Sequence, residues 1–422
     1  MKINVSADSI IKNSFYQFLW FTFFASAFFI FGRVPNRLFV DITSVAFIFI
    51  LLFQYGLEIV KSIQRKKIKG ITLIMMPFIL IPIISAIQSN KVFGQPLAYG
   101  ILAQRQLTMI LCAHFIACAL GDGWLTKEKF EKYFIGSLHI LLVVFLFFYL
   151  FVNPVHFVNS EFVTLSPNKG YRYEFPDSCI YGLFLYGLFK IWILKEKNWL
   201  FSVLLCSFYI LNFLMDRTQL IAIVGTICVY WALNFSLPRI IRTFIVGGIG
   251  AILFLGVVGL IAPEFIEKNI KLYVTAGETL SGEKVSESST HVRFMESKIA
   301  LAGFLKHPIL GVGFLSNKWN DGFRSLNKHF YPIDVGLLGN LFVYGIFGTL
   351  IFYIPFYYSW RYSFKINKKD DALIVSTIYV MLFQFADYFT CASNQKFYGV
   401  IAVYFGIIYY YRYRKENLID SK

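Results

Sequence analysis

The side chains that could support catalysis gather in a few segments between long apolar runs. One long segment, 263–334, contains His291, Arg293, Glu296 and His329, and it closes with Asp334. A carboxylate or an imidazole can accept a proton from a reacting hydroxyl, most effectively when its pKa lies near the working pH. Arginine binds phosphate groups through paired, charge-assisted hydrogen bonds. The segment therefore carries the groups needed for a general base and for stabilising a phosphate leaving group.

Further arginines stand beside other apolar runs. Arg172 lies in a second polar segment, 153–176, and Arg217 lies in the short Asp-Arg-Thr break between two runs. Together with Arg293 they could clamp a pyrophosphate, although each could instead anchor a helix end or pair with a carboxylate. Arg105 lies inside an apolar run. An ionisable group there is a functional candidate, and pairing with a neighbouring carbonyl is the alternative.

Asp334 is the first choice for a proton acceptor, ahead of His291 and His329. It begins the helix that we expect directly after the long segment, so it would face the space between that segment and the helices. Partial burial there would raise its pKa toward a value useful for a base. Asp is also a common helix N-cap, and this structural role is the alternative.

Several familiar catalytic motifs are missing from the sequence. It contains no serine nucleophile elbow, no His-Glu-x-x-His, no phosphate-binding loop and no dinucleotide fingerprint. Its six cysteines show neither zinc spacing nor a disulfide framework. We therefore expect a metal-independent site without a cofactor, in which the substrate itself arrives activated.

The elements that position these groups are long apolar helices. Hydrophobic residues make up 57% of the 422 residues and charged residues only 15%. Runs of about 18 or more apolar residues predict helices that span a bilayer. We expect an all-α polytopic membrane bundle of about 12 spans, a single integral membrane domain over residues 1–422. The expected spans lie near 15–32, 42–60, 71–88, 99–120, 134–152, 177–194, 199–215, 219–236, 241–262, 335–358, 372–390 and 397–411.

The basic residues predict how the bundle is oriented. With both termini inside, the cytoplasmic segments carry 23 Lys and Arg residues against 7 in the short outer segments. Positive residues concentrate on the cytoplasmic side of membrane proteins. The net charge of +16 therefore reflects orientation and does not indicate nucleic acid binding. We expect both termini in the cytoplasm, and segments 153–176 and 263–334 on the outer face.

The long segment itself contains an expected amphipathic helix that begins near Thr290 and ends before Pro308. Its apolar stripe is predicted to pack on the membrane domain or to lie in the membrane interface. The stripe consists of Val292, Met295, Ile299, Ala302 and Leu305. Gly311 and Gly313 follow, and they permit backbone conformations in which a ligand could approach closely. We find no internal repeat and no inverted pair of interrupted helices, which disfavours a transporter.

Two stretches carry a family resemblance. The first is Arg-Phe-Met-Glu-Ser-Lys-Ile-Ala-Leu-Ala-Gly-Phe-Leu-Lys-His-Pro-Ile-Leu-Gly-Val-Gly-Phe, from Arg293 to Phe314. The second is Asp-Val-Gly-Leu-Leu-Gly-Asn-Leu-Phe-Val-Tyr-Gly-Ile-Phe-Gly, from Asp334 to Gly348. Both are similar to the long periplasmic loop and the following helix of the O-antigen polymerase and ligase superfamily. Asp-Arg-Thr at Arg217 resembles the Ser-Arg-Thr turn of that family.

The resemblance implies a membrane glycosyltransferase of the bacterial inner membrane. Its donor would be an oligosaccharide on undecaprenyl pyrophosphate, and its associates would be membrane lipid, a chain-length regulator and a flippase. It implies a catalytic role for Asp334, Arg293 and Arg217. We assign substrate binding to Arg172, His291, Glu296, His329 and Arg105.

The resemblance leaves two activities possible, that of a polymerase and that of a ligase. A polymerase joins lipid-linked repeat units into O-antigen or capsule, whereas a ligase transfers the polymer to lipid A–core. Ligases usually carry a histidine where this chain has Asp334, which favours the polymerase. Polymerases are described with Arg-x10-Gly motifs, but Arg172 to Gly182 and Arg293 to Gly303 leave nine residues between. A non-catalytic polysaccharide or lipid transporter is the alternative from another class.

The charge bias gives a topological prediction that reporter fusions can test. Fusions in the basic segments should read as cytoplasmic, at Lys67, Lys129, Lys195 and Lys368. Fusions at Ser166 and Lys284 should read as periplasmic, because they lie in the two outer segments. A cytoplasmic signal at Lys284 would place the candidate site on the wrong side of the membrane and would overturn its assignment.

Overall fold

Long apolar helices make up most of the computed structural model. It describes residues 37–64, 68–123, 125–157, 163–166, 170–173, 175, 178–214, 217–236, 238, 289–363, 371–390 and 398–420. The principal helices are α3 (Arg37–Gln64), α4 (Gly70–Phe93), α6 (Cys112–Gly121), α7 (Lys127–Phe151), α8 (Ser178–Leu194), α9 (Leu200–Tyr209), α10 (Arg217–Asn234), α13 (Ser289–Lys306), α14 (Gly336–Ser363), α15 (Ala372–Thr390) and α16 (Tyr398–Asp420). A short antiparallel hairpin, β1 (Val163–Ser166) and β2 (Gly170–Tyr173), follows α7.

Three helical segments are long and apolar enough to cross a membrane by themselves: 70–93, 127–151 and 332–362. A fourth is a pair bent by 50°, formed by α5 (Leu97–Ala103) and residues 107–121. Shorter apolar helices cover 179–194, 219–234 and 372–387. The expected spans at 15–32 and 241–262 lie outside the described residues. The fold is thus helical with three or four candidate spans, and the expected number of about 12 remains a prediction.

Large apolar side chains cover the outside of several helices. Phe49 of α3 is 68% exposed, Phe201 of α9 is 73% exposed and Ile221 of α10 is 73% exposed. Soluble monomers rarely expose contiguous apolar surface on this scale. A lipid environment would cover these side chains, which agrees with the apolar composition of the helices.

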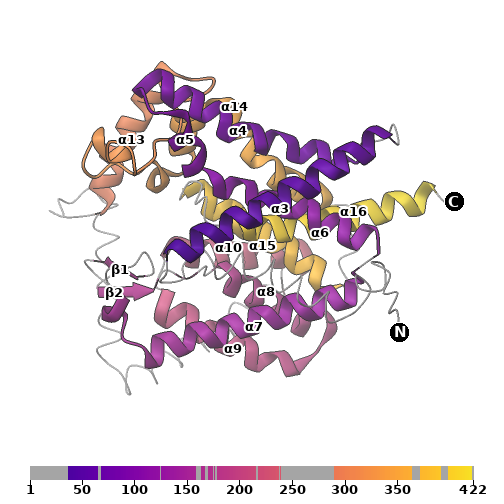
Figure 1. Ribbon diagram of the computed structural model, residues 1–422. Helices are drawn as coiled ribbons and strands as arrows, with labels where there is room; N and C mark the ends of the chain where they lie inside the picture. The colour runs from indigo at the N-terminus through magenta and orange to yellow at the C-terminus, as the bar shows by residue number, and fades with distance from the viewer. Residues whose placement is uncertain are drawn as a thin grey trace, which may run out of the picture.

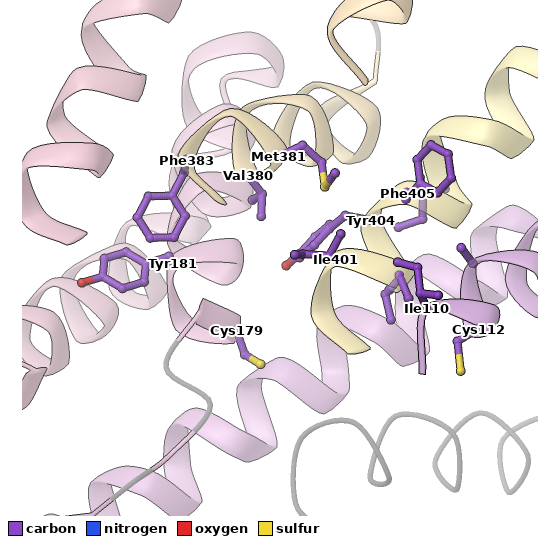
Figure 2. Close-up of a cluster of buried hydrophobic side chains, with 14 of the residues drawn as sticks. Ile110, Cys112, Cys179, Tyr181, Val380, Met381, Phe383, Ile401, Tyr404 and Phe405 are labelled. Carbon is purple, nitrogen blue, oxygen red and sulfur yellow. The ribbon is translucent and has the colours of Figure 1, made fainter. Parts of the chain in front are cut away.

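The centre of the bundle is formed by α8, α15 and α16. Residues 372–381 of α15 are all buried, because this helix is surrounded by others and is apolar on every side. The ring of Tyr181 in α8 lies 4.6 Å from that of Phe383 in α15, and Tyr404 of α16 meets Phe134 of α7 edge to face at 5.6 Å. Figure 2 shows Tyr181, Phe383 and Tyr404, which come from helices far apart in the sequence.

Ion pairs join the helices at one end of the bundle. Lys127, at the start of α7, pairs with Asp371 just before α15, and Asp371 also accepts a hydrogen bond from Tyr411 of α16. Lys69 lies 3.2 Å from Glu58 and 3.3 Å from Asp122. The C-terminus lies at this end, whereas α13 and the hairpin lie at the opposite end (Figure 1). We call these the C-terminal end and the α13 end.

Helix α14 is broken at Gly345, where the backbone has φ 64° and ψ −170°. The segment 308–313 inserts its backbone beside this break. The amides of Val312 and Gly313 donate to the carbonyls of residues 342 and 343, each at 2.9 Å. The amides of residues 346 and 347 donate to Pro308 and Ile309, at 2.9 and 3.1 Å. We call these four hydrogen bonds the α14 interlock. They satisfy backbone groups that the break would otherwise leave unpaired.

The same segment is fastened to α4. A Cβ atom on Gly313 would lie 2.3 Å from the backbone of both Ser85 and Ser89. The buried Gln95 side chain donates to the Phe314 carbonyl at 2.9 Å and accepts from the Ser316 amide at 2.8 Å. A Cβ on Gly311 would lie 2.4 Å from the Val343 carbonyl oxygen. The expectation that Gly311 and Gly313 admit a ligand is therefore wrong, because neighbouring backbone occupies the space.

Replacing Gly345 with alanine should destabilise the protein strongly. Its backbone conformation is nearly exclusive to glycine and costs other residues about 1–3 kcal/mol. A Cβ there would also lie 2.3 Å from the Ile309 carbonyl oxygen. We expect a lower midpoint of thermal unfolding in detergent. Gly136→Ala in α7 is the matched control, because no atom lies within 4 Å of its Cβ and alanine favours a helix. Equal midpoints for the two variants would contradict the interlock.

Candidate functional site

Helix α13 lies against α14 through small and polar residues. Ala300 and Glu296 are buried, and Gly303 is so close to the Phe342 ring that a Cβ would lie 2.2 Å from it. Val292, Met295 and Leu305 are exposed, at 40%, 44% and 67%. The expectation that the whole apolar stripe packs on the bundle is therefore wrong: Ile299 packs against the core, but the close helix approach uses the face that carries Gly303. A position in the membrane interface remains a prediction for the stripe.

Glu296 is the buried acid of this helix, with 3% of its surface exposed. Its Oε1 atom accepts a hydrogen bond of 2.9 Å from the Tyr331 amide. The Tyr331 carbonyl in turn accepts a hydrogen bond of 2.9 Å from the Asp334 amide, in the short 3-10 helix η6 (Pro332–Val335). The Oε2 atom of Glu296 is also buried and has no hydrogen-bond partner among the described residues. Glu296 thus ties α13 to the turn that carries Asp334.

Three charged groups interact here, and we call them the carboxylate cluster: Arg293, Glu296 and Asp334. The pKa of Glu296 is raised to about 7: burial is the largest cause, the negative charge of Asp334 adds to the shift, and Arg293 opposes it. A carboxyl with such a pKa carries a proton in part of the molecules at neutral pH. Perturbed acids of this kind are frequent in functional sites. The cluster can therefore hold and exchange one proton close to neutral pH.

The accessible members of the cluster are Arg293 and Asp334, whose side chains are both exposed. The Asp334 carboxylate accepts no hydrogen bond from a backbone amide in the part of the chain that the structure describes, so it does not act there as an N-cap. His329 is exposed and its amide bonds to Asn327 Oδ1 at 3.0 Å. His329 does not contribute to the charge interactions of Glu296 or Asp334.

The remaining candidates stand apart from this cluster or cannot be placed. Arg105 follows α5 and donates from Nη1 to the Leu102 carbonyl at 3.0 Å, the neighbouring-carbonyl pairing that was the alternative to a functional role. The backbones of Arg172, Arg217 and His291 belong to β2, α10 and α13. Their side chains lie outside the described part of the structure. Their proposed roles stay predictions.

A cavity of about 70 Å³ adjoins the carboxylate cluster, because Tyr331, Pro332 and Ile333 form part of its lining. Arg324 also lines it, and its guanidinium lies 4.9 Å from the centre of the Tyr331 ring. Sequence reasoning missed Arg324 because it lies in an irregular segment without periodicity. Its proximity to Tyr331 could not be read from spacing.

Comparisons with known proteins do not assign a family to this chain. No protein-family model matches this chain, and no curated protein matches it. Within the described residues, no three His, Cys, Asp or Glu side chains are grouped so that they could hold a metal ion. The site contains the exposed carboxylate of Asp334, the exposed guanidinium of Arg293 and the buried acid Glu296. Glu296 lies on the same helix as Arg293 and is hydrogen-bonded to the turn that carries Asp334. These groups suit proton transfer beside an anionic leaving group.

The raised pKa of Glu296 predicts a pH-dependent stability difference. A buried carboxyl whose pKa is raised stabilises the fold while it is protonated, and this stability is lost as the pH rises from about 4.5 through about 7. Glu296→Gln keeps a neutral acceptor for the Tyr331 amide at all pH values. Relative to wild type, the free energy of unfolding of the variant should rise by about 2.5 kcal/mol between pH 5 and pH 8.

Thermal unfolding in detergent at pH 5, 6, 7 and 8 measures this difference. Glu128→Gln serves as the control, because Glu128 is exposed at the start of α7. Either glutamate or glutamine at this position is in contact with water. A gap between Glu296→Gln and wild type that stays constant with pH would show that Glu296 does not titrate in this range.

Proposed function

We propose that this protein is a membrane glycosyltransferase that polymerises undecaprenyl-pyrophosphate-linked oligosaccharide repeat units into O-antigen or capsular polysaccharide. One observation carries the proposal: Arg293, Glu296 and Asp334 form an electrostatic cluster at the α13 end of an apolar helical bundle. Arg293 and Asp334 open the two stretches that resemble the O-antigen polymerase and ligase superfamily, and Glu296 lies in the first of them. Lipid-linked donors reach such a site along the membrane surface, and they need neither nucleotide nor metal.

The bundle would lie in the inner membrane with its α13 end toward the periplasm. Among the described residues, the C-terminal end carries basic residues of the expected cytoplasmic segments, including Lys69 and Lys127. This distribution follows the positive-inside rule. The carboxylate cluster would then face the side where lipid-linked repeat units are presented after transfer across the membrane.

In the proposed reaction, a hydroxyl oxygen of the acceptor bonds to the anomeric carbon of the donor. The bond from that carbon to the pyrophosphate breaks, and undecaprenyl pyrophosphate leaves with the electron pair. Asp334 takes the hydroxyl proton, because its carboxylate is the exposed one. Arg293 stabilises the charge that develops on the leaving group. Glu296 holds the turn from which Asp334 projects.

One observation favours the transporter alternative: helix α14 is broken at Gly345. Interrupted helices form the substrate sites of many transporters, where their free backbone groups bind the cargo. In this chain the α14 interlock pairs the four backbone groups beside the break with residues 308, 309, 312 and 313. The break therefore supports a transport site only weakly. The ligase alternative differs from the polymerase in its acceptor, which is lipid A–core. The experiment below distinguishes the two activities.

A deletion strain tests the proposal through the banding pattern of its lipopolysaccharide. Core carrying a single repeat indicates a polymerase, and bare core with accumulated lipid-linked polymer indicates a ligase. Loss of both polymer and outward lipid-linked species indicates a transporter. Complementation with Arg293→Ala should slow polymerisation about 10²–10³-fold, the usual effect of removing a donor aimed at developing charge. Complementation with Asp334→Asn should slow it about 10²–10⁴-fold, the usual contribution of a general base. Arg293→Lys should rescue only partly, because an ammonium lacks the paired fork.

Protein levels in the membrane must match wild type for these variants. Lys306→Gln is a suitable control, because it removes a cation from the exposed last turn of α13 without touching the cluster. Normal polymer in the Asp334→Asn strain would show that the proton acceptor lies elsewhere. Full rescue by Arg293→Lys would assign Arg293 a general electrostatic role.

A further inference from the structure

The cavity beside the carboxylate cluster is walled mainly by aromatic rings. Phe323 and Phe330 are buried and meet edge to face, with ring centres 6.2 Å apart. Phe314, Tyr331 and Tyr344 complete the aromatic lining. By the measure in which one water molecule needs about 10–15 Å³, the volume of about 70 Å³ holds several waters. This space suits a small ligand group with an apolar face.

Two polar side chains, Asn317 and Arg324, stand among these rings. Both are exposed, so they mark the side of the cavity that opens to solvent. The Arg324 guanidinium lies over the Tyr331 ring, which orients its plane while leaving its edge N–H groups able to donate. An amide beside a guanidinium provides both acceptor and donors for hydroxyl groups.

The cavity is joined directly to the proposed catalytic turn. Ile333 lines the cavity and Asp334 is the next residue, so their Cα atoms are about 3.8 Å apart. The amide of Tyr331, another lining residue, is held by Glu296. A ligand in the cavity would therefore lie beside the turn that carries Asp334, the residue that the proposed function uses as a proton acceptor.

We propose that this cavity is a saccharide subsite, which binds one sugar ring of the acceptor through its C–H face and its hydroxyl groups. A sugar ring presents an apolar C–H face to aromatic walls and a rim of hydroxyls to Arg324 and Asn317. Binding sites of this kind are mostly apolar with a few placed polar groups. The inference rests on the proposed function for the identity of the acceptor, and it adds the residues that select it.

Saturation-transfer NMR on the full-length protein in nanodiscs tests the subsite without any reaction. The ligand is the free oligosaccharide repeat released by mild acid hydrolysis from the polysaccharide of the host strain. With the wild-type protein, we expect saturation transfer from the protein to be concentrated on the protons of one sugar ring. Arg324→Gln should weaken binding about tenfold, the equivalent of 1.4 kcal/mol, and Arg324→Lys should restore it in part. Lys328→Gln is the matched control, because Lys328 is exposed nearby but does not line the cavity.

The outcomes separate the subsite from the proposed function. Loss of transfer in Arg324→Gln with retention in Lys328→Gln supports the subsite. Absence of transfer in wild type, or equal transfer in all variants, overturns it even if the deletion strain lacks polymer. An unchanged polysaccharide in the deletion strain overturns the proposed function instead. In that case selective loss of transfer in Arg324→Gln would still establish saccharide binding.

Discussion

The α14 interlock is the constraint on which the α13 end of the molecule depends. A helix broken in apolar surroundings leaves amides and carbonyls without partners, and each such group is costly to bury. Residues 308–313 remove this cost by pairing with the chain on both sides of Gly345. They follow directly on α13, and the start of α14 follows directly on η6. The interlock therefore fixes both elements that carry the carboxylate cluster.

Glycine makes this arrangement sterically possible. Gly311 and Gly345 have positive φ angles and lie against each other so closely that a Cβ on either would meet backbone atoms within 2.6 Å. Gly303 permits the close contact between α13 and the Phe342 ring. Larger residues at these positions would separate α13 from α14. That separation would remove the burial of Glu296, and its pKa would return toward the ordinary value.

The two ends of the bundle use charge differently. At the C-terminal end, Lys127 and Asp371 form an ion pair between the helix starts, and Lys190 lies 3.5 Å from Glu196 and 3.8 Å from Glu131. These pairs bring opposite charges together and hold helix ends in register. At the α13 end, within the described part of the chain, the carboxyls of Glu296 and Asp334 share the guanidinium of Arg293, so negative charge is incompletely balanced there. Such an imbalance favours proton uptake, which suits a site that takes a proton from a substrate.

Composition and pattern alone predict the helical, apolar character of this protein and the segments that carry its charge. Uninterrupted apolar runs of about 20 residues predict membrane helices, and α4, α7, α14 and α15 lie where these runs predicted them. Arg293 and Glu296 are three residues apart, a spacing that places two residues on one side of a helix. Tertiary structure alone decided that Glu296 is buried, that Asp334 approaches it and that Arg324 borders a cavity. Burial depends on contacts between distant segments, such as the hydrogen bond from the Tyr331 amide to Glu296. The local spacing of residues does not predict such contacts.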